Sequence, residues 1–211
     1  MTDIAPYLPG ILAAYAILAV GAASPGPAVA MLLGISSGQG RAPALVTCLG
    51  IATGSATINV LTMLGVGLLI SQAAWAMTLL KLVGSAYLLW LAWGAFRKAL
   101  NPPQVQAISV TRQPAPQLFA KGYLLQVTNP KAIAFWLAIA AIGAVEGAEL
   151  PIIAVFVLGA WLLSFTLHGA WAVFLSSGPV RAAYASGRGW IEGALGAFFT
   201  FAAFKIATSE S

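Results

Sequence analysis

The sequence predicts an all-α integral membrane protein with six transmembrane helices, arranged as two inverted repeats of three helices each. The first observation is composition, since 60% of the 211 residues are hydrophobic and only 7% are charged. The second is length, because several charge-free stretches approach or exceed the ~20 residues that span ~30 Å of hydrocarbon. The third is a pair of proline-containing interruptions at corresponding places in the two halves of the chain.

Apolar segments account for the six helices, at residues 8–35, 44–69, 73–96, 119–145, 150–177 and 190–207. Turn residues such as Ser177-Gly178-Pro179 separate them. The longest connection, residues 101–117, is polar and rich in proline, so we expect an extended linker there. The chain is therefore expected to divide into a first repeat at 1–100, this linker, and a second repeat at 118–211.

The first segment is interrupted by Pro25-Gly26-Pro27. Each proline lacks an amide hydrogen and clashes with the preceding turn, and glycine is conformationally permissive, so we expect the helix to break there. In the fourth segment Asn129-Pro130-Lys131 interrupts the pattern at the matching place, with Asn129 suited to cap a half-helix and Pro130 to its first turn. Such paired breaks are typical of a central binding site in a repeat-built transporter, and three helices per half make the repeat inverted.

The second and third segments are apolar with few polar positions. Gly50 and Gly54 form a Gly-x-x-x-Gly pair, which favours close helix packing inside the bundle over a dimer contact, although a homodimer is compatible with it. Asn59 either lines a cavity or bonds across helices. Lys81 is either a functional cation or a lysine that snorkels to the membrane interface.

The last three segments carry the remaining polar candidates. Lys131 lies ten residues beyond Lys121 at the cytoplasmic edge, which places it ~15 Å deep, near the membrane midplane. Gln126 lines a cavity or bonds between helices, and His168 is a packing residue or a proton carrier. Glu192, near the cytoplasmic start of the sixth segment, is the single acidic residue within the apolar segments and a candidate for ion coupling.

The distribution of basic residues predicts the orientation, because short loops rich in Lys and Arg stay cytoplasmic. These residues lie in or beside the first, third and fifth connections, as Arg41, Arg97, Lys98, Arg112, Lys121, Arg181 and Arg188. The second and fourth connections contain none. We therefore expect both termini to be extracytoplasmic and the 101–117 linker to be cytoplasmic. The net charge of +5 follows from this topology and does not indicate nucleic-acid binding.

An enzyme is not predicted, because the chain has one cysteine and one histidine, too few for a metal centre or a thiol pair. We expect no cofactor and no metal, and the partners we expect are membrane lipids and a small substrate. A transporter for small zwitterionic solutes explains the two breaks best. A carrier of another small anionic or zwitterionic metabolite, or a structural membrane subunit without transport, stays an alternative.

Several stretches together resemble the LysE/RhtB family of bacterial amino-acid exporters: SPGPAVAMLLGISSGQGRA, GIATG, KLVGSAYLLWLAWGAFRKA and TNPKAIAFWLA. The resemblance covers most of the chain. It implies a multi-pass inner-membrane carrier that moves amino acids out of the cytoplasm. The functional positions it implies are Pro25, Gly26 and Pro27 in the first break and Asn129, Pro130 and Lys131 in the second.

The expected substrates are neutral amino acids or close derivatives. Many family members have an acidic residue or Asn directly after Pro-Gly-Pro, whereas this chain has Ala28. A buried cationic side chain of a substrate would also lack a carboxylate partner in the apolar segments. The mechanism we expect is alternating access around a central site, where the half-helix N-termini and Lys131 receive the substrate carboxylate.

Overall fold

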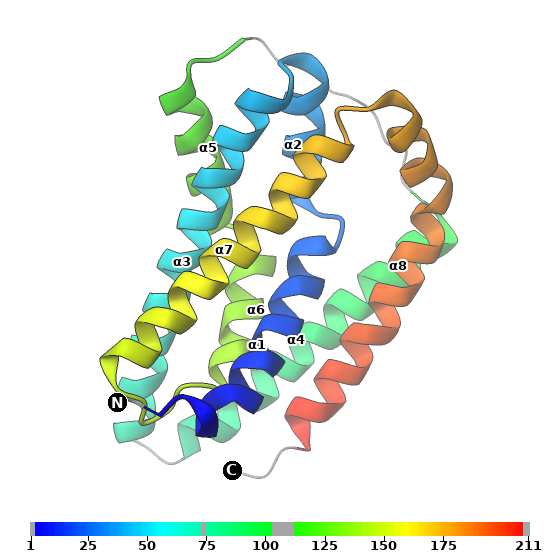
Figure 1. The fold of residues 1–211 in the computed structure, drawn as a ribbon. Helices are drawn as coiled ribbons and strands as arrows, with labels where there is room; N and C mark the ends of the chain where they lie inside the picture. Colours follow the sequence, from blue (N-terminus) through cyan, green and yellow to red (C-terminus); the bar gives the residue numbers. More distant parts are fainter. Residues whose placement is uncertain (1–2, 73–74, 103–111, 209–211) are drawn as a thin grey trace.

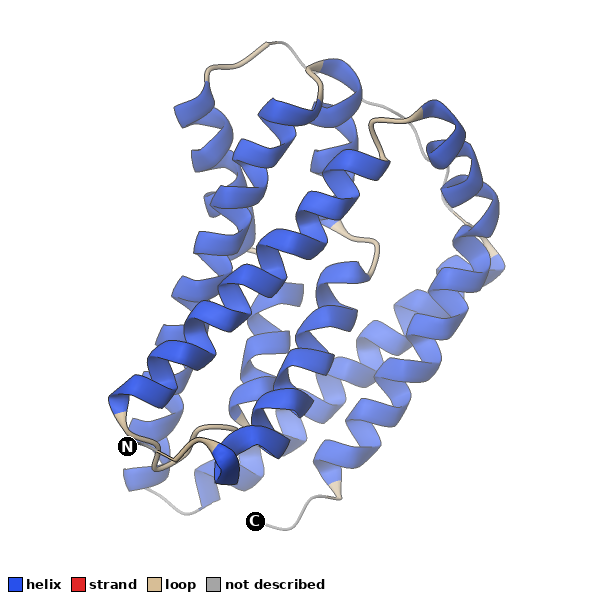
Figure 2. Ribbon diagram, viewed as in Figure 1, coloured by secondary structure: helices blue, strands red, loops and turns tan. Residues whose placement is uncertain are grey.

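The computed structural model describes residues 3–72, 75–102 and 112–208, and these residues form helices and turns without any strand (Figures 1 and 2). A short 3₁₀ helix, Ala5–Tyr7, precedes the first long helix. The helices that follow are α1 (Leu8–Ala23), α2 (Pro27–Gly38), α3 (Arg41–Gln72), α4 (Trp75–Leu100), α5 (Ala115–Val127), α6 (Pro130–Ala140), α7 (Leu150–Phe174) and α8 (Gly178–Ala207).

Both predicted interruptions are present in the structure. The first apolar segment is divided into α1 and α2 at residues 24–26, and the fourth into α5 and α6 at residues 128–129. Four helices of the described residues are long and apolar enough to cross a membrane, namely Ala5–Ala23, Arg41–Gly65, Leu150–Phe174 and Gly178–Ala207. The half-helices α2 and α6 are apolar but shorter.

Two helix boundaries differ from the prediction by five residues or more. Helix α8 begins at Gly178 and not near residue 190, because Pro179 fits its first turn and Ser177 takes the N-cap position. Its first turns carry Arg181 and Arg188, so hydropathy alone placed the start too late. Helix α6 ends at Ala140, five residues before the predicted end, and the following turn includes Gly143 with a φ of 66°. That conformation favours glycine and ends the helix.

The helices pack in an order that brings the two halves of the chain together. Helix α3 packs against α5 and α7, α1 packs against α6 and α7, and α4 pairs with α8 at one side of the bundle (Figure 1). Both chain ends lie at the same end of the bundle (Figure 1). The connections from α2 to α3 and from α7 to α8 lie at the opposite end (Figure 1).

Small residues bring α3 and α5 into close contact. A Cβ atom on Gly122 of α5 would overlap the Thr47 carbonyl oxygen of α3, and one on Gly50 would overlap the Phe119 carbonyl oxygen. A Cβ on Gly54 would lie 3.0 Å from the Cβ of Gln126. The expected packing of the Gly-x-x-x-Gly pair inside the bundle is therefore confirmed, and it holds the end of α5 against the middle of α3.

Large apolar side chains cover the outside of the helices. Among those that are more than half exposed are Leu61, Trp90, Trp93, Leu150, Trp190, Phe201 and Phe204. Exposed apolar surface of this extent on several helices is typical of contact with lipid. The buried side chains form separate clusters, one of which joins α1, α3, α6 and α7.

Candidate functional site at the two helix breaks

The first break places extended backbone between α1 and α2. Helix α1 ends at Ala23, and Ser24 has φ −76° and ψ 135°. Gly26, the N-cap residue of α2, is also extended, with φ −173°, a conformation open to any residue. Ser24 is buried, and its hydroxyl donates a hydrogen bond to the Gly21 carbonyl oxygen at 2.7 Å. Its own carbonyl lies beyond the helix and needs a partner from elsewhere.

The second break is a capped helix start. Helix α5 ends at Val127, and Asn129 takes the N-cap position of α6 with Pro130 directly after it. The Asn129 side-chain oxygen accepts a hydrogen bond from the backbone N–H of Lys131 at 3.1 Å. The predicted capping role of Asn129 is thus confirmed, and the cap sets the direction in which the Lys131 side chain leaves α6.

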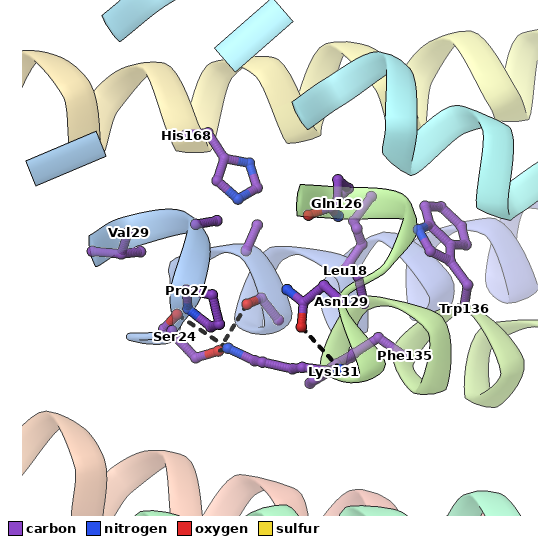
Figure 3. A pocket seen from close by; sticks show the side chains of 15 residues that line it. Leu18, Ser24, Pro27, Val29, Gln126, Asn129, Lys131, Phe135, Trp136 and His168 are labelled. Carbon is purple, nitrogen blue, oxygen red and sulfur yellow. Dashed lines mark hydrogen bonds between the residues drawn. The ribbon is translucent and has the colours of Figure 1, made fainter. Parts of the chain in front are cut away.

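Lys131 joins the two breaks (Figure 3). Its Nζ donates a hydrogen bond to the Ser24 carbonyl oxygen at 3.1 Å and also contacts the Ser24 hydroxyl. A Cβ atom on Gly26 would lie 3.3 Å from Nζ, so the ammonium sits directly against the start of α2. The Phe135 ring lies 6.0 Å from Nζ, at the outer limit of a cation–π contact. Two segments 107 residues apart therefore meet through one charged side chain.

A small cavity of about 40 Å³ lies at this junction. Of the predicted site residues, Gly26, Pro27, Asn129 and Lys131 line it, together with Gln126 and His168 (Figure 3). Pro25 and Pro130 belong to the breaks but are not among the described residues that line the cavity. The remaining lining residues are Leu18, Gly21, Ala22, Ser24, Ala28, Val29, Ala132, Phe135 and Trp136.

The cavity offers only water-sized space. A water needs roughly 10–15 Å³ of such volume, whereas pockets for small ligands measure roughly 300–1,000 Å³. At about 40 Å³ the cavity has space for a few waters at most and is too small for an amino acid. A substrate of that size would require the helices around the breaks to move apart.

The polar groups on the cavity wall supply both donors and acceptors. His168 is buried, and its Nδ1 lies 2.8 Å from the Ser164 carbonyl oxygen. Because a carbonyl oxygen only accepts, Nδ1 carries the proton there, and in the neutral ring Nε2 is an acceptor. Gln126 contributes an amide from the end of α5. No acidic residue is among the described residues that line the cavity.

Three other predicted positions lie away from this cavity. Lys81 is buried on α4, and Asn59 on α3 lines a second cavity. Glu192 is buried on α8, where its carboxylate lies 3.8 Å from the Arg188 guanidinium one turn earlier. Glu192, the single acidic residue of the predicted apolar segments, therefore lies next to a basic residue of its own helix. The described residues contain no group of three or more His, Cys, Asp or Glu side chains that could hold a metal.

Sequence reasoning missed three residues of the site. Ser24 contacts the Lys131 ammonium, Phe135 lies beside it, and Trp136 lines the cavity. The Trp136 indole N–H donates a hydrogen bond to the Ser55 hydroxyl of α3 at 3.0 Å. Ser24 could have been found from its place directly before Pro25, where a broken helix leaves a carbonyl without its usual donor. The two aromatic residues had no comparable signal.

Comparisons with known proteins identify the family of the chain. The family model described as LysE type translocator matches residues 19–210, which includes both breaks. The chain is 31% identical over 165 residues to the uncharacterized membrane protein YahN of Escherichia coli (strain K12), covering 76% of this chain and 72% of that protein.

Two efflux proteins are also similar. The threonine efflux protein of Escherichia coli (strain K12) is 33% identical over 121 residues, covering 54% of this chain and 56% of that protein. The homoserine/homoserine lactone efflux protein of Salmonella typhimurium (strain LT2) is 32% identical over 112 residues, covering 53% of each chain. The chain thus spans about half the length of these two relatives. No solved structure matches the chain significantly.

Proposed function

The chain belongs to the LysE type translocator family, and on that premise we propose that it exports small neutral amino acids or close derivatives by alternating access. Members of this family are transporters and not enzymes, and amino-acid efflux is the activity named for two of the relatives. The chain is a multi-pass protein of the bacterial inner membrane. Its substrate, its mechanism and its orientation in that membrane are the proposal.

The observation that supports the proposal is the position of the Lys131 ammonium at the start of α2. No side chain of the described residues caps this helix, whereas Asn129 caps α6. A helix N-terminus with unused amides attracts an anion, and Ala28 and Val29 of the first turn line the cavity. We therefore place the substrate carboxylate between the first turn of α2 and Lys131, and not equally at both half-helices.

Lys131 can serve this role while it bonds to Ser24. An ammonium carries three N–H donors, and the described contacts with Ser24 engage its carbonyl and hydroxyl oxygens. A carboxylate beside the same Nζ would make a charge-assisted hydrogen bond, which is stronger than a neutral one. The ammonium group of the substrate would find acceptors in the Gln126 amide oxygen and in Nε2 of His168.

Selectivity for neutral amino acids follows from the absence of acid on the described cavity wall. A lysine or arginine side chain would bring a second cation into a site that already holds Lys131. Taking such a charge out of water without a partner costs several kcal/mol. His168, Lys81 and Glu192 stay candidates for ion coupling, and a homodimer stays a prediction.

Alternating access needs two halves that move against each other, and the packing is compatible with an inverted repeat. We take α1–α2, α3 and α4 as the first three spans and α5–α6, α7 and α8 as their counterparts. Exchanging the two sets maps the α3–α5 contact onto the α7–α1 contact and the α1–α6 contact onto the α5–α2 contact. It maps the α3–α7 and α4–α8 contacts onto themselves. A pseudo-two-fold axis through the two breaks would produce this pattern.

The orientation is proposed from charge. The connections α2–α3 and α7–α8, with Arg41 and Arg181 beside them, lie at the end of the bundle opposite the chain ends (Figure 1). Loops with basic residues stay cytoplasmic. Both termini and the α6–α7 connection would then lie outside the cell.

Counterflow in proteoliposomes tests the function. Vesicles are loaded with one unlabelled solute and then given a trace of the same solute with a label outside. We expect transient accumulation of labelled threonine or homoserine, the amino acids in the names of the two relatives, and none of lysine. Succinate and aspartate test an anionic metabolite instead. A folded, monodisperse protein that accumulates no solute of this panel would contradict the proposal and favour a structural subunit.

A further inference from the structure

A second cavity lies between α3, the end of α6 and the start of α7, and it is much larger than the first. Its volume is about 680 Å³, within the roughly 300–1,000 Å³ of small-molecule pockets. Glu146, Gly147 and Leu150 at its rim are exposed and belong to the α6–α7 connection and the first residue of α7. That connection lies at the end of the bundle where both chain ends are found (Figure 1).

Asn59 of α3 also lines this cavity, and its side-chain amide has no hydrogen-bond partner among the described residues. Its exposed fraction is 0%, and neither its side-chain nitrogen nor its oxygen has a partner among the described residues. Buried polar groups are almost always hydrogen-bonded in folded proteins, and an unsatisfied one costs about 1–3 kcal/mol. An amide in this state at the inner end of a large cavity indicates a ligand that reaches it in another conformation.

The layer between the two cavities is about one helical turn thick. Trp136 lines the central cavity, whereas Ile139 and Ala140, three and four residues later on α6, line the larger one. At 1.5 Å per residue this separation is about 5–6 Å along the helix. Trp136, Ile139 and Phe156 belong to one buried apolar cluster, and Trp136 lines the central cavity whereas Ile139 and Phe156 line the larger one.

One side-chain hydrogen bond crosses this layer between α3 and α6. The Trp136 indole N–H donates to the Ser55 hydroxyl at 3.0 Å, and Ser55 lies one turn before Asn59 on α3. A rotation of the indole away from Ser55 would remove the largest side chain of the layer from between the cavities. We expect the same movement to expose the Asn59 amide, which lies one turn beyond Ser55 on α3.

From these contacts we propose that the larger cavity is the outer vestibule of the transport path, that Trp136 is its inner gate, and that Asn59 binds the amino acid as it passes. This inference rests on the proposed export function. The Asn59 amide offers a donor for the substrate carboxylate and an acceptor for its ammonium group. Ser55 acts as a positioning residue, because it holds the indole and does not itself face the vestibule in the described structure.

Cysteine labelling tests the vestibule without measuring transport. Cys48 is buried and is the single cysteine of the chain, so Cys48→Ala supplies a background for new cysteines. We expect Met63→Cys and Ala154→Cys, inside the vestibule, to react with a charged, membrane-impermeant methanethiosulfonate applied outside intact cells. Leu158→Cys is the matched control, because Leu158 is 59% exposed on α7 but is not among the residues that line the vestibule.

The control should react only with a lipid-soluble maleimide. If the two vestibule cysteines behave like the control, the cavity faces lipid and the inference is wrong. Labelling from the cytoplasmic side alone would also overturn it. Because labelling is independent of transport, the vestibule is tested even if counterflow fails.

Asn59→Cys and Asn59→Leu test the gate and the contact. With Trp136 in place, we expect Asn59→Cys to react with the same reagent only when a transported amino acid is present. When Trp136→Ala is added, Asn59→Cys should react faster, even without the amino acid. Asn59→Leu removes an unsatisfied amide, so a purely structural role predicts unchanged export from a more stable protein. We expect export to fall about 5-fold instead, the loss of one hydrogen bond of ordinary strength to the substrate. If the wild type shows counterflow and Asn59→Leu also exports normally, this inference is refuted and the proposed export function is not.

Discussion

Replacing Lys131 by Met removes the charge at the two breaks and keeps the length of the side chain. The Lys131 Nζ bonds the Ser24 carbonyl oxygen at 3.1 Å and contacts its hydroxyl, so the change also takes away a partner of buried Ser24. We expect transport to fall strongly, because a hydrogen bond to a charged group is worth about 1.5–3 kcal/mol. At 1.36 kcal/mol per factor of ten, that loss is roughly 10- to 150-fold in export.

The effect on stability is the difference of two terms of similar size. A Ser24 carbonyl left without its donor costs about 1–3 kcal/mol. A lysine at the membrane midplane costs about 2.5–3.5 kcal/mol on insertion scales, and Met removes this cost. The two nearly cancel, so Lys131→Met should accumulate in the membrane and unfold at a temperature close to that of the wild type.

Two further variants separate charge from hydrogen bonding. Lys131→Arg keeps the charge and should retain part of the export, whereas Lys131→Gln keeps a donor for Ser24 and should lose export with the charge. The assay is counterflow of a neutral amino acid, normalised to folded protein in the vesicles. Normal counterflow by well-folded Lys131→Met would refute the placement of the substrate carboxylate at this ammonium. Full activity of Lys131→Gln would show that Lys131 only supports the Ser24 carbonyl.

The remaining predictions concern packing, selectivity and topology. Gly122→Ala should destabilise the purified protein by about 1–3 kcal/mol through overpacking and so lower its thermal unfolding temperature, because its Cβ would overlap the Thr47 carbonyl oxygen. Gly94→Ala, with no atom within 4 Å of its Cβ, is the control and should change little. Equal unfolding temperatures for both would contradict the close α3–α5 contact. Ala28→Asp places a carboxylate on the cavity wall and should shift export toward lysine in efflux assays; unchanged preference would count against the charge argument. A reporter enzyme that works only outside the cytoplasm should be active when it is fused to the C-terminus. Activity of a reporter that works only in the cytoplasm, fused at the same end, would reverse the proposed orientation.

The sequence by itself determined where the two helices break. Pro25, Pro27 and Pro130 lack an amide hydrogen wherever they stand, and Asn129 caps a helix through its own neighbouring amide, so these features are local and independent of the rest of the fold. The same holds for the apolar segments, whose length is a property of the chain. Boundaries set by a glycine conformation, as at Gly143, or by a polar first turn, as in α8, were less visible in the hydropathy pattern.

Only the tertiary structure decided which side chains meet. The membrane-crossing helices are apolar on nearly every side, so periodicity does not reveal which face turns toward another helix. The bonds from Lys131 to Ser24 and from Trp136 to Ser55 depend on how residues of different helices pack. The same holds for the burial of Asn59, which has no side-chain partner in the described part of the chain. The sequence predicts that Lys131 lies deep in the membrane and is costly there. The fold shows that its ammonium lies at the start of α2, because the two breaks, far apart in the chain, face each other across the bundle.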